Sequence, residues 1–335
     1  MTILLVRHGE TDGNAARVLQ RPEVPLNERG LHQADRLAHR LLAHGFVHIL
    51  CSDLLRARMT AAPLADDAPG LLARAETENF PVALFVLSRA QRRHLMAIYG
   101  FARLCDELGD SAPGDRLAQL DWLASDLDRA FAGQAKHPLV AKLEPSLREL
   151  ALPRAPFDGL IEANRRDQTK SRYASWAELA EYCEYSANPV GRLVLHVFGA
   201  ATPERIALSD RVCTALQLAE HCQDVGEDFR AGRVYLPAED MARFGASEAD
   251  LAKPSAPPAL RKVLCFEVER ARDLLDSGAA LVPTLRGRAR LAVAGFVAGG
   301  RAALDAIRHA NFDVLATQAK PRRRDLARRL VGAWR

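Results

Sequence analysis

The chain has 335 residues, 48% of them hydrophobic and 6% aromatic, which is enough apolar material for one large helical domain or for a domain with a small addition. Its 46 basic and 42 acidic residues leave a net charge of +4, and so balanced a composition predicts no nucleic-acid partner. The six cysteines are dispersed without a CxxC pair, which argues against a zinc site and against a disulfide framework. No apolar run approaches about 18 residues and the start of the chain lacks the layout of a signal peptide, so we expect a cytoplasmic protein.

The first 65 residues differ in character from the rest. MTILLVRHGETDGN predicts a buried β-strand followed by a loop, and HILCSDLLRARMTAAPLA predicts a second strand that leads into a helix. Both stretches resemble the opening of the histidine phosphatases of the phosphoglycerate mutase-like superfamily. That resemblance implies that His8 is a phosphorylated nucleophile and that Arg7 and Arg56 bind phosphate.

This first resemblance covers only part of the phosphatase fold. The family needs a further acid residue and a second histidine-bearing strand downstream, and the sequence supplies neither before its pattern changes at Glu78. We therefore expect residues 1–65 to form a short, incomplete α/β fragment without phosphatase activity. Residues 66–78 combine a Pro-Gly turn signal with mixed charges and predict a linker.

Apolar spacing from residue 80 onwards predicts helices almost throughout, and the first of these helices ends in an acidic face. In IYGFARLCDELGD, the side chains of Tyr99, Arg103, Asp106 and Asp110 fall within about 60° of one another on a helical projection. An aspartate pair spaced by four residues occurs by chance on many helices. The pair indicates a functional site only if a second acidic pair accompanies it.

Two features mark the middle of the chain. Arg165, Lys170, Arg172 and Tyr173 form a basic cluster in RRDQTKSRY, which either faces an anionic ligand or lies on a solvated surface. In ANPVGR a proline and a glycine fall inside a predicted helix, where both residue types cost stability. A bend with small residues at this place would leave room for a long ligand chain.

The second acidic face lies in QLAEHCQDVGED. On a helix, Gln217, Glu220, Asp224 and Asp228 fall within a sector about 80° wide. Two carboxylates about 6 Å apart repel by roughly 3 kcal/mol at an effective dielectric of about 20, so an inward-facing row of them requires a counter-charge. Oxygen ligands without thiolate or imidazole favour a hard cation such as Mg²⁺. The alternative is a solvated helix face.

Together the two faces predict one site. If the two helices lie side by side and antiparallel, their four aspartates can hold several Mg²⁺ ions, and these ions can bind a diphosphate. Arg103 would add a guanidinium group whose shape matches a phosphate.

These motifs resemble those of the squalene and phytoene synthases, the head-to-head prenyl synthases of the all-α isoprenoid synthase fold. ENFPVALFVLSRAQRRHLMAIYGFARLCDELGD is similar to their first aspartate-rich region, and DVGEDFRAGRVYLP to their second. Within the family, ENFPVA, RRDQTKSRY and YCEYSANPVGRLVLHVFG resemble the hydroxysqualene synthases of bacterial squalene and hopanoid biosynthesis. The resemblance implies a mainly α domain over residues 79–335.

The resemblance also implies roles for individual residues. It assigns Mg²⁺ binding to Asp106, Asp110, Asp224 and Asp228, and catalysis to Tyr99, Arg103, Tyr182, Arg233 and Tyr235. It assigns substrate binding to Asn79, Phe80, Lys170, Val190, Gly191, Gln217, Glu220 and Phe296. Two residues depart from the general family pattern: Glu220 replaces the usual Asn and Gln223 the usual Arg, which argues against a generic condensing enzyme.

Three functions stay open at this stage. The first is Mg²⁺-dependent conversion of presqualene diphosphate to hydroxysqualene, which needs no nicotinamide. The second is condensation of two farnesyl or geranylgeranyl diphosphates to squalene, dehydrosqualene or phytoene. The third is a phosphohydrolase, or a phosphate-binding fusion, that acts through His8. The basic tail KPRRRDLARRLVGAWR is either solvated or attached to an anionic membrane surface.

Overall fold

The computed structural model describes residues 8, 10–12, 24–41, 56–57, 59–60, 87–110, 112, 114–317 and 319. The chain divides into two compact units, Met1–Pro81 and Val82–Arg335. The strands predicted in MTILLV and HILC, the predicted linker 66–78 and the basic tail lie outside the described residues.

The described part of the first unit contains helix α2, Glu28–Leu41. Asn27 caps its start, because its side-chain oxygen accepts a hydrogen bond of 2.9 Å from the backbone N–H of Gly30.

The second unit is built of helices, as the sequence predicts. They are α6 (Arg89–Asp110), α7 (Arg116–Phe131), α8 (Pro138–Ala141), α9 (Glu144–Glu149), α10 (Ala155–Asp167), α11 (Trp176–Ser186), α12 (Asn188–Val197), α13 (Pro203–Gln223), α14 (Val225–Arg230), α15 (Ala238–Phe244), α16 (Glu248–Leu251), α17 (Pro258–Gly278), α18 (Leu281–Thr284) and α19 (Gly287–His309). Within the described residues, β-pairing is limited to one isolated bridge between Arg172 and Val234. The prediction of a mainly α fold is confirmed.

Local sequence signals set where several helices begin and end. The side chains of Asp115, Ser175 and Thr202 accept hydrogen bonds from the first turns of α7, α11 and α13. The predicted break at ANPVGR is present, but it separates two helices instead of bending one. Pro189 stands in the first turn of α12, where its missing N–H removes no helical hydrogen bond.

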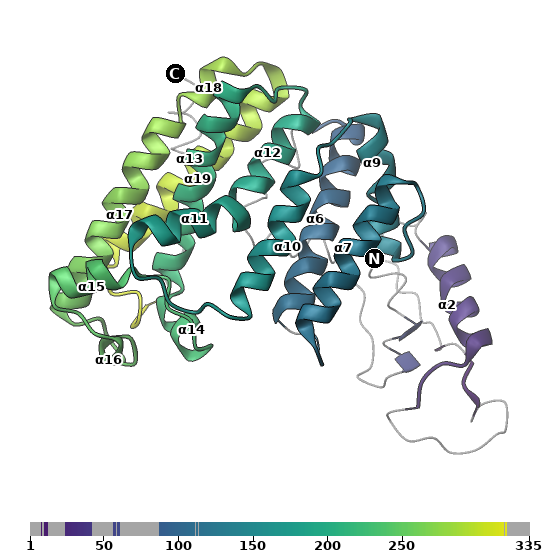
Figure 1. The fold of residues 1–335 in the computed structure, drawn as a ribbon, viewed down its shortest axis with the longest axis horizontal. Helices are drawn as coiled ribbons and strands as arrows, with labels where there is room; N and C mark the ends of the chain where they lie inside the picture. Colours follow the sequence, from purple (N-terminus) through teal and green to yellow (C-terminus); the bar gives the residue numbers. More distant parts are fainter. Residues whose placement is uncertain are drawn as a thin grey trace, which may run out of the picture. The chain divides into compact units, whose positions relative to one another are not determined.

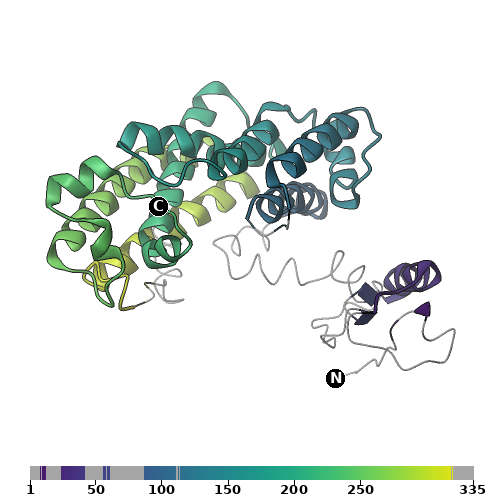
Figure 2. The same cartoon turned by 60° about the horizontal axis from the view of Figure 1, so that its bottom comes forward.

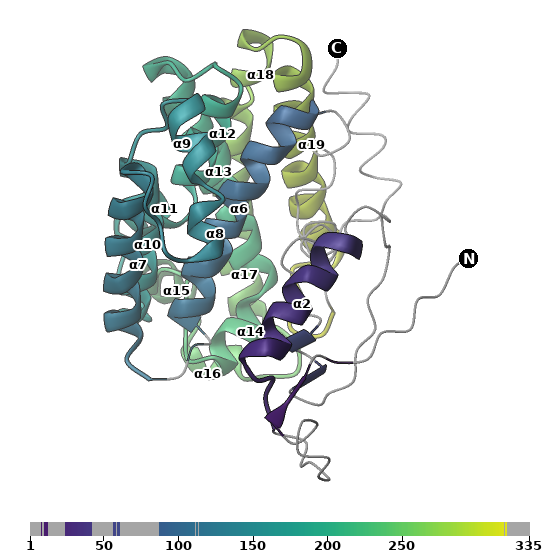
Figure 3. The same ribbon diagram turned by 90° about the vertical axis from the view of Figure 1, so that its right-hand side faces the viewer.

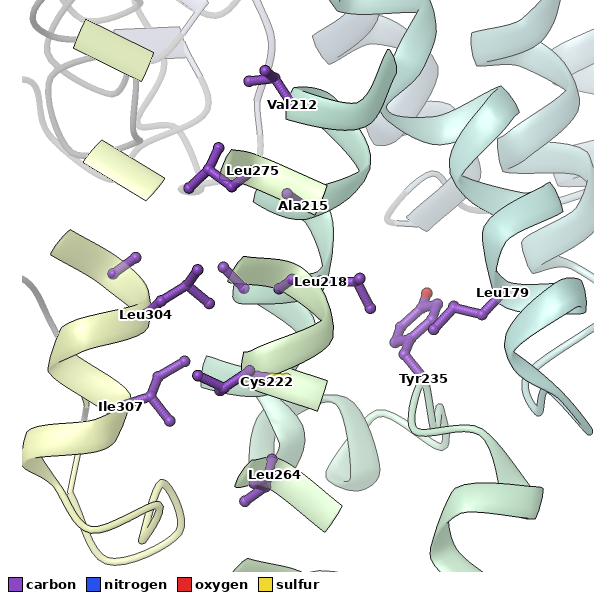
Figure 4. Packing of buried hydrophobic residues seen from close by; sticks show 14 of the residues in the cluster. Leu179, Val212, Ala215, Leu218, Cys222, Tyr235, Leu264, Leu275, Leu304 and Ile307 are labelled. Atoms are coloured by element: carbon purple, nitrogen blue, oxygen red, sulfur yellow. The ribbon is translucent and has the colours of Figure 1, made fainter. Parts of the chain in front are cut away.

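Two buried hydrophobic clusters hold this unit together. One joins α6, α7, α10 and α12 and includes Phe101 and Phe157, whose rings meet edge to face with centroids 5.3 Å apart. The larger one joins α11, α13, α17 and α19, and Leu218, Leu264 and Leu304 are buried within it (Figure 4). Figures 1 and 2 place α6 and α7 at one end of this unit and α15 and α17 at the other.

The two helices that carry the acidic motifs are α6 and α13, and Figure 3 shows α6 in blue across the near face of this unit. They are not immediate neighbours, because α10 and α12 lie between them in Figure 1, and α12 packs against both. The two acidic helices therefore form opposite walls of a cavity.

Candidate active site

A cavity of about 340 Å³ lies between the two walls, and every element that lines it belongs to the second unit. It is lined by Asp106, Asp110, Leu160, Ala163, Asn164, Tyr182, Ser186, Gln217, Glu220, His221, Asp224, Asp228, Arg233 and Tyr235. Nine of these fourteen were predicted as site residues. The four predicted metal-binding aspartates are among them.

The first wall is the last part of α6. Asp106 and Asp110 are four residues apart, so their side chains leave the helix on the same side and face the cavity. Arg103 lies beside them, with a guanidinium nitrogen 4.0 Å from a carboxylate oxygen of Asp106, but it does not line the cavity.

Asn164 on α10 supports this wall from behind. Its amide nitrogen donates to the backbone oxygen of Leu160 at 3.1 Å and lies 3.5 Å from a carboxylate oxygen of Asp106. A Cβ atom at Gly109 would stand 2.2 Å from the side-chain oxygen of Asn164. The buried amide can therefore occupy this position only because residue 109 has no side chain.

The second wall departs from the predicted single helix. Helix α13 ends at Gln223, and Asp224 stands between it and α14 with φ −101° and ψ 12°. Backbone hydrogen bonds of 2.9 Å and 2.8 Å still link Asp224 to Glu220 and Asp228 to Asp224. The turn spacing is thus preserved, and Gln217, Glu220, Asp224 and Asp228 all reach the cavity.

Crowding of carboxylates on the second wall changes the acidity of Asp228. Burial raises the pKa of Asp228 to about 7, with Asp224 and Glu220 raising it further and Arg233 opposing them. Negative charge at this wall is therefore unfavourable unless a cation compensates it.

Arg233 joins the two walls. It follows α14, and its guanidinium group contacts the carboxylate of Asp110 on α6. That contact, together with Tyr235 and Asp167, raises the pKa of Arg233, so the group stays charged inside the cavity. The prediction that Arg233 lies at the site is consistent with this position.

An aromatic group forms the third side of the cavity. The ring of His221 stacks on Tyr235 with centroids 3.9 Å apart, and Tyr182 lies 5.7 Å from Tyr235. The Tyr182 hydroxyl donates a hydrogen bond of 2.8 Å to Asp167 at the end of α10. Burial raises the pKa of Tyr182 and raises that of Asp167 to about 6.

Sequence reasoning missed Asn164, Ser186 and His221. Asn164 and Ser186 stand at ordinary helical positions and carry no motif. His221 lies inside the second acidic motif, next to Glu220, and its place on the same helical face as Gln217 was the available signal.

Several predicted site residues do not line this cavity. Tyr99, Val190 and Phe296 are half-buried elsewhere in the unit. Lys170 forms an ion pair of 3.2 Å with Glu178. Asn79, Phe80 and Arg7 lie outside the described residues.

Gly191 has a packing role in the structure. A Cβ atom there would lie 2.5 Å from both Cys213 Sγ and Ser209 Oγ on α13. The absence of a side chain lets α12 and α13 approach each other, so the position serves helix packing and not the cavity lining.

The lining is mostly polar, with Leu160 and Ala163 as its aliphatic members. Ligand pockets measure roughly 300–1,000 Å³, so about 340 Å³ matches a compact polar group. The room for a long ligand chain that the sequence predicts beside ANPVGR is not part of this cavity.

The donor set can be tested against the predicted Mg²⁺. Asp106, Asp110, Asp224 and Asp228 offer only oxygen, as a hard cation prefers. Burial, and then the neighbouring carboxylates of Asp224 and Glu220, raise the pKa of Asp228, and a bound cation would counter both effects. Within the described residues, no three acidic, histidine or cysteine side chains are grouped closely enough to hold a metal ion by themselves. The residues thus fit a cation that takes further oxygens from a bound ligand.

In the first unit, His8 and Arg56 lie together. The Arg56 guanidinium donates a hydrogen bond of 3.2 Å to the Nε2 atom of His8. Two of the three residues predicted for phosphate chemistry therefore meet, although 48 positions separate them.

Comparison with known proteins agrees with this geometry. The squalene/phytoene synthase family model matches residues 73–327. The chain belongs to the squalene/phytoene synthase family. As such it is an enzyme, and its helical unit has the all-α fold of that family. A separate model, the histidine phosphatase superfamily (branch 1), matches residues 3–78.

Individual members of the family show how similar the chain is. A hydroxysqualene synthase of Rhodopseudomonas palustris is 36% identical over 211 residues, which cover 62% of this chain and 72% of that protein. A 15-cis-phytoene synthase of Synechococcus elongatus is 32% identical over 260 residues, covering 72% of this chain and 83% of the other. The crystal structure of a squalene synthase from Alicyclobacillus acidocaldarius has a TM-score of 0.67 and 37% identity, and the match covers 84% of this chain and 95% of that one.

Across the described residues, every helix is too short or too polar to cross a lipid bilayer. The predicted attachment of the basic tail to a membrane surface concerns residues outside the described part. It stays a prediction.

Proposed function

We propose that this family member converts presqualene diphosphate to hydroxysqualene in squalene and hopanoid biosynthesis. The observation that carries the proposal is the meeting of four aspartates and Arg233 from distant segments in one cavity. The similarity to hydroxysqualene synthases at 36% identity supports the choice of substrate and product.

In this proposal the cavity binds the diphosphate group. Arg233 donates to its oxygens, and Gln217 adds a neutral hydrogen-bonding group on the second wall. Mg²⁺, when held by the four aspartates, would neutralise the diphosphate and make it a better leaving group. Tyr182 and Tyr235 present aromatic rings to the carbon that loses the diphosphate, where a positive charge develops.

A condensing activity is the second candidate. It is favoured by the 32% identity to a phytoene synthase over a longer part of the chain. The substitutions at Glu220 and Gln223 oppose it, because an acid and an amide replace the Asn and Arg of the general motif.

A product assay separates the two candidates. The purified full-length protein is incubated with Mg²⁺ and either presqualene or farnesyl diphosphate, with and without NADPH, and products are identified by mass. We expect hydroxysqualene from presqualene diphosphate, independent of NADPH. A hydrocarbon formed from farnesyl diphosphate, with presqualene diphosphate left unconverted to alcohol, would contradict the proposal.

Aspartate variants test the site. Asp228→Asn should lower kcat about 100-fold and raise the Mg²⁺ concentration needed for half-maximal rate, because a metal-binding charge is lost. Asp273 on α17 is an exposed aspartate outside the cavity, so Asp273→Asn serves as the matched control. Equal rates in both variants would remove Asp228 from the site.

A further inference from the structure

The cavity has two chemically distinct parts. Carboxylates and Arg233 form the charged part described above. The second part is neutral. Ser186, Gln217 and His221 line the same cavity and contribute a hydroxyl, an amide and an imidazole. The proposed function uses the charged part and Gln217 but assigns no role to Ser186 or His221.

His221 is held in one orientation. Its side chain is 6% exposed, its ring stacks on Tyr235, and its Nε2 atom lies 3.4 Å from the Gln217 amide nitrogen. Burial lowers the pKa of His221 to about 3, so the ring is neutral at physiological pH. The Gln217 amide nitrogen can only donate, so the lone pair of the neutral imidazole is on Nε2, where it can accept a hydrogen bond from Gln217 or a proton from a water molecule.

Ser186 supplies an independent observation. It is the last residue of α11, and its Oγ atom is buried without a hydrogen-bond partner among the described residues. An unsatisfied buried hydroxyl costs folding free energy. A water molecule in a polar cavity is the ordinary way to recover that energy, because it bonds to several such groups at once.

We infer that Ser186, Gln217 and His221 form a binding site for the water molecule that ends the reaction, and that His221 accepts a proton from that water. The inference rests on the proposed function. It deepens that function by naming the residues that determine an alcohol product instead of a hydrocarbon.

The step balances without a further reactant. The carbon–oxygen bond to the diphosphate breaks, and its electron pair leaves with the diphosphate. After the carbon skeleton rearranges, a lone pair of the water oxygen forms a bond to the cationic carbon. One water proton passes to His221, which then returns it to the released diphosphate. Even a weakly basic imidazole suffices, because an alcohol protonated on oxygen is a far stronger acid than imidazolium.

His221→Phe tests this site because it keeps an aromatic ring against Tyr235 but removes both nitrogens. Presqualene diphosphate is supplied with Mg²⁺ in H₂¹⁸O, and diphosphate release and the labelled alcohol are measured together. We expect the alcohol share of the product to fall at least fivefold, with hydrocarbons taking its place, while diphosphate release falls much less. Ser186→Ala should lower the alcohol share at least twofold.

His196→Phe is the matched control, since His196 is half-buried on α12 and does not line the cavity. Thermal unfolding shows which variants are folded, and Ser186→Ala decides alone if His221→Phe does not fold. An unchanged alcohol share in the folded variants would overturn the inference while leaving the proposed function intact. If the unaltered enzyme made no alcohol at all, the proposed function itself would fail.

Discussion

The guanidinium group of Arg233 contacts the carboxylate of Asp110 from the opposite side of the cavity, 123 positions away in the chain. The contact places a permanent positive charge among the carboxylates of both walls. An anionic ligand that enters the cavity can take the place of Asp110 as the partner of the Arg233 guanidinium group.

Replacing Arg233 should therefore damage catalysis more than folding. We expect Arg233→Ala to lower kcat/KM for presqualene diphosphate about 100-fold, because a preorganised donor to the leaving group is lost. Arg233→Lys should recover part of the rate, since lysine keeps the charge but not the planar fork. Steady-state kinetics measure both.

Arg230, exposed on α14, provides the control. Arg230→Ala should keep its rate within about twofold of the unaltered enzyme, as surface substitutions usually have small effects. A similar loss in Arg230→Ala and Arg233→Ala would mean that general positive charge, and not this contact, matters.

Stability should depend on pH through Asp167. Burial raises the pKa of Asp167 to about 6, above its ordinary 3.8, so the folded state binds the proton more tightly than the unfolded state. The free energy of folding that Asp167 contributes by binding this proton is fully present below about pH 4, and it is lost as the pH rises through about 6. Between pH 5 and pH 8, Asp167→Asn should lose less stability than the unaltered protein, by on the order of 1–2 kcal/mol.

Urea unfolding at both pH values, without Mg²⁺, measures that difference. The neutral amide cannot ionise, yet its oxygen can still accept from the Tyr182 hydroxyl, so the hydrogen bond is kept. Identical pH dependence in the two proteins would show that Asp167 does not have a raised pKa.

Packing at Gly191 can be tested apart from catalysis. Gly191→Ala should destabilise the protein by about 1–3 kcal/mol, because the new methyl group would overlap with Cys213 and Ser209. Gly299→Ala on α19 is the matched control, since a Cβ there meets nothing within 4 Å and alanine favours a helix by up to about 1 kcal/mol. Thermal unfolding compares them, and equal midpoints would refute the packing role.

The histidine phosphatase-like fragment should be silent in catalysis. We expect no phosphomonoester hydrolysis above background, and we expect His8→Ala to convert presqualene diphosphate at the rate of the unaltered enzyme. A colorimetric assay with a generic phosphomonoester checks the first point. Hydrolysis that disappears in His8→Ala would instead establish a second active site.

Much of the fold and of the charged cavity could be predicted because both follow from helical spacing. Asp106 and Asp110, like Glu220 and Asp224, are four residues apart, so a pattern of residue types alone puts each pair on one face. The end of α13 at Gln223 was not predicted, yet the four-residue spacing continues through Asp224.

Contacts between helices that are distant in the chain could not be predicted from the sequence. The small residues at the bend predicted room for a ligand chain beside Gly191, but side chains of α13 fill that room. Arg103 and Tyr99 share the helical face of the aspartates, yet they lie up to two or three turns away from Asp110, beyond the part of α6 that reaches the cavity. Spacing gives the face of a helix and not how far along it a ligand lies.

The contact between Gly109 and Asn164 limits how these two positions can vary. A larger residue at 109 displaces the amide beneath Asp106 unless residue 164 becomes shorter at the same time. Either change alone would alter the support of a carboxylate in the cavity. Among relatives that share this arrangement, we therefore expect the two positions to exchange residues as a pair, although they lie 55 positions apart in the chain.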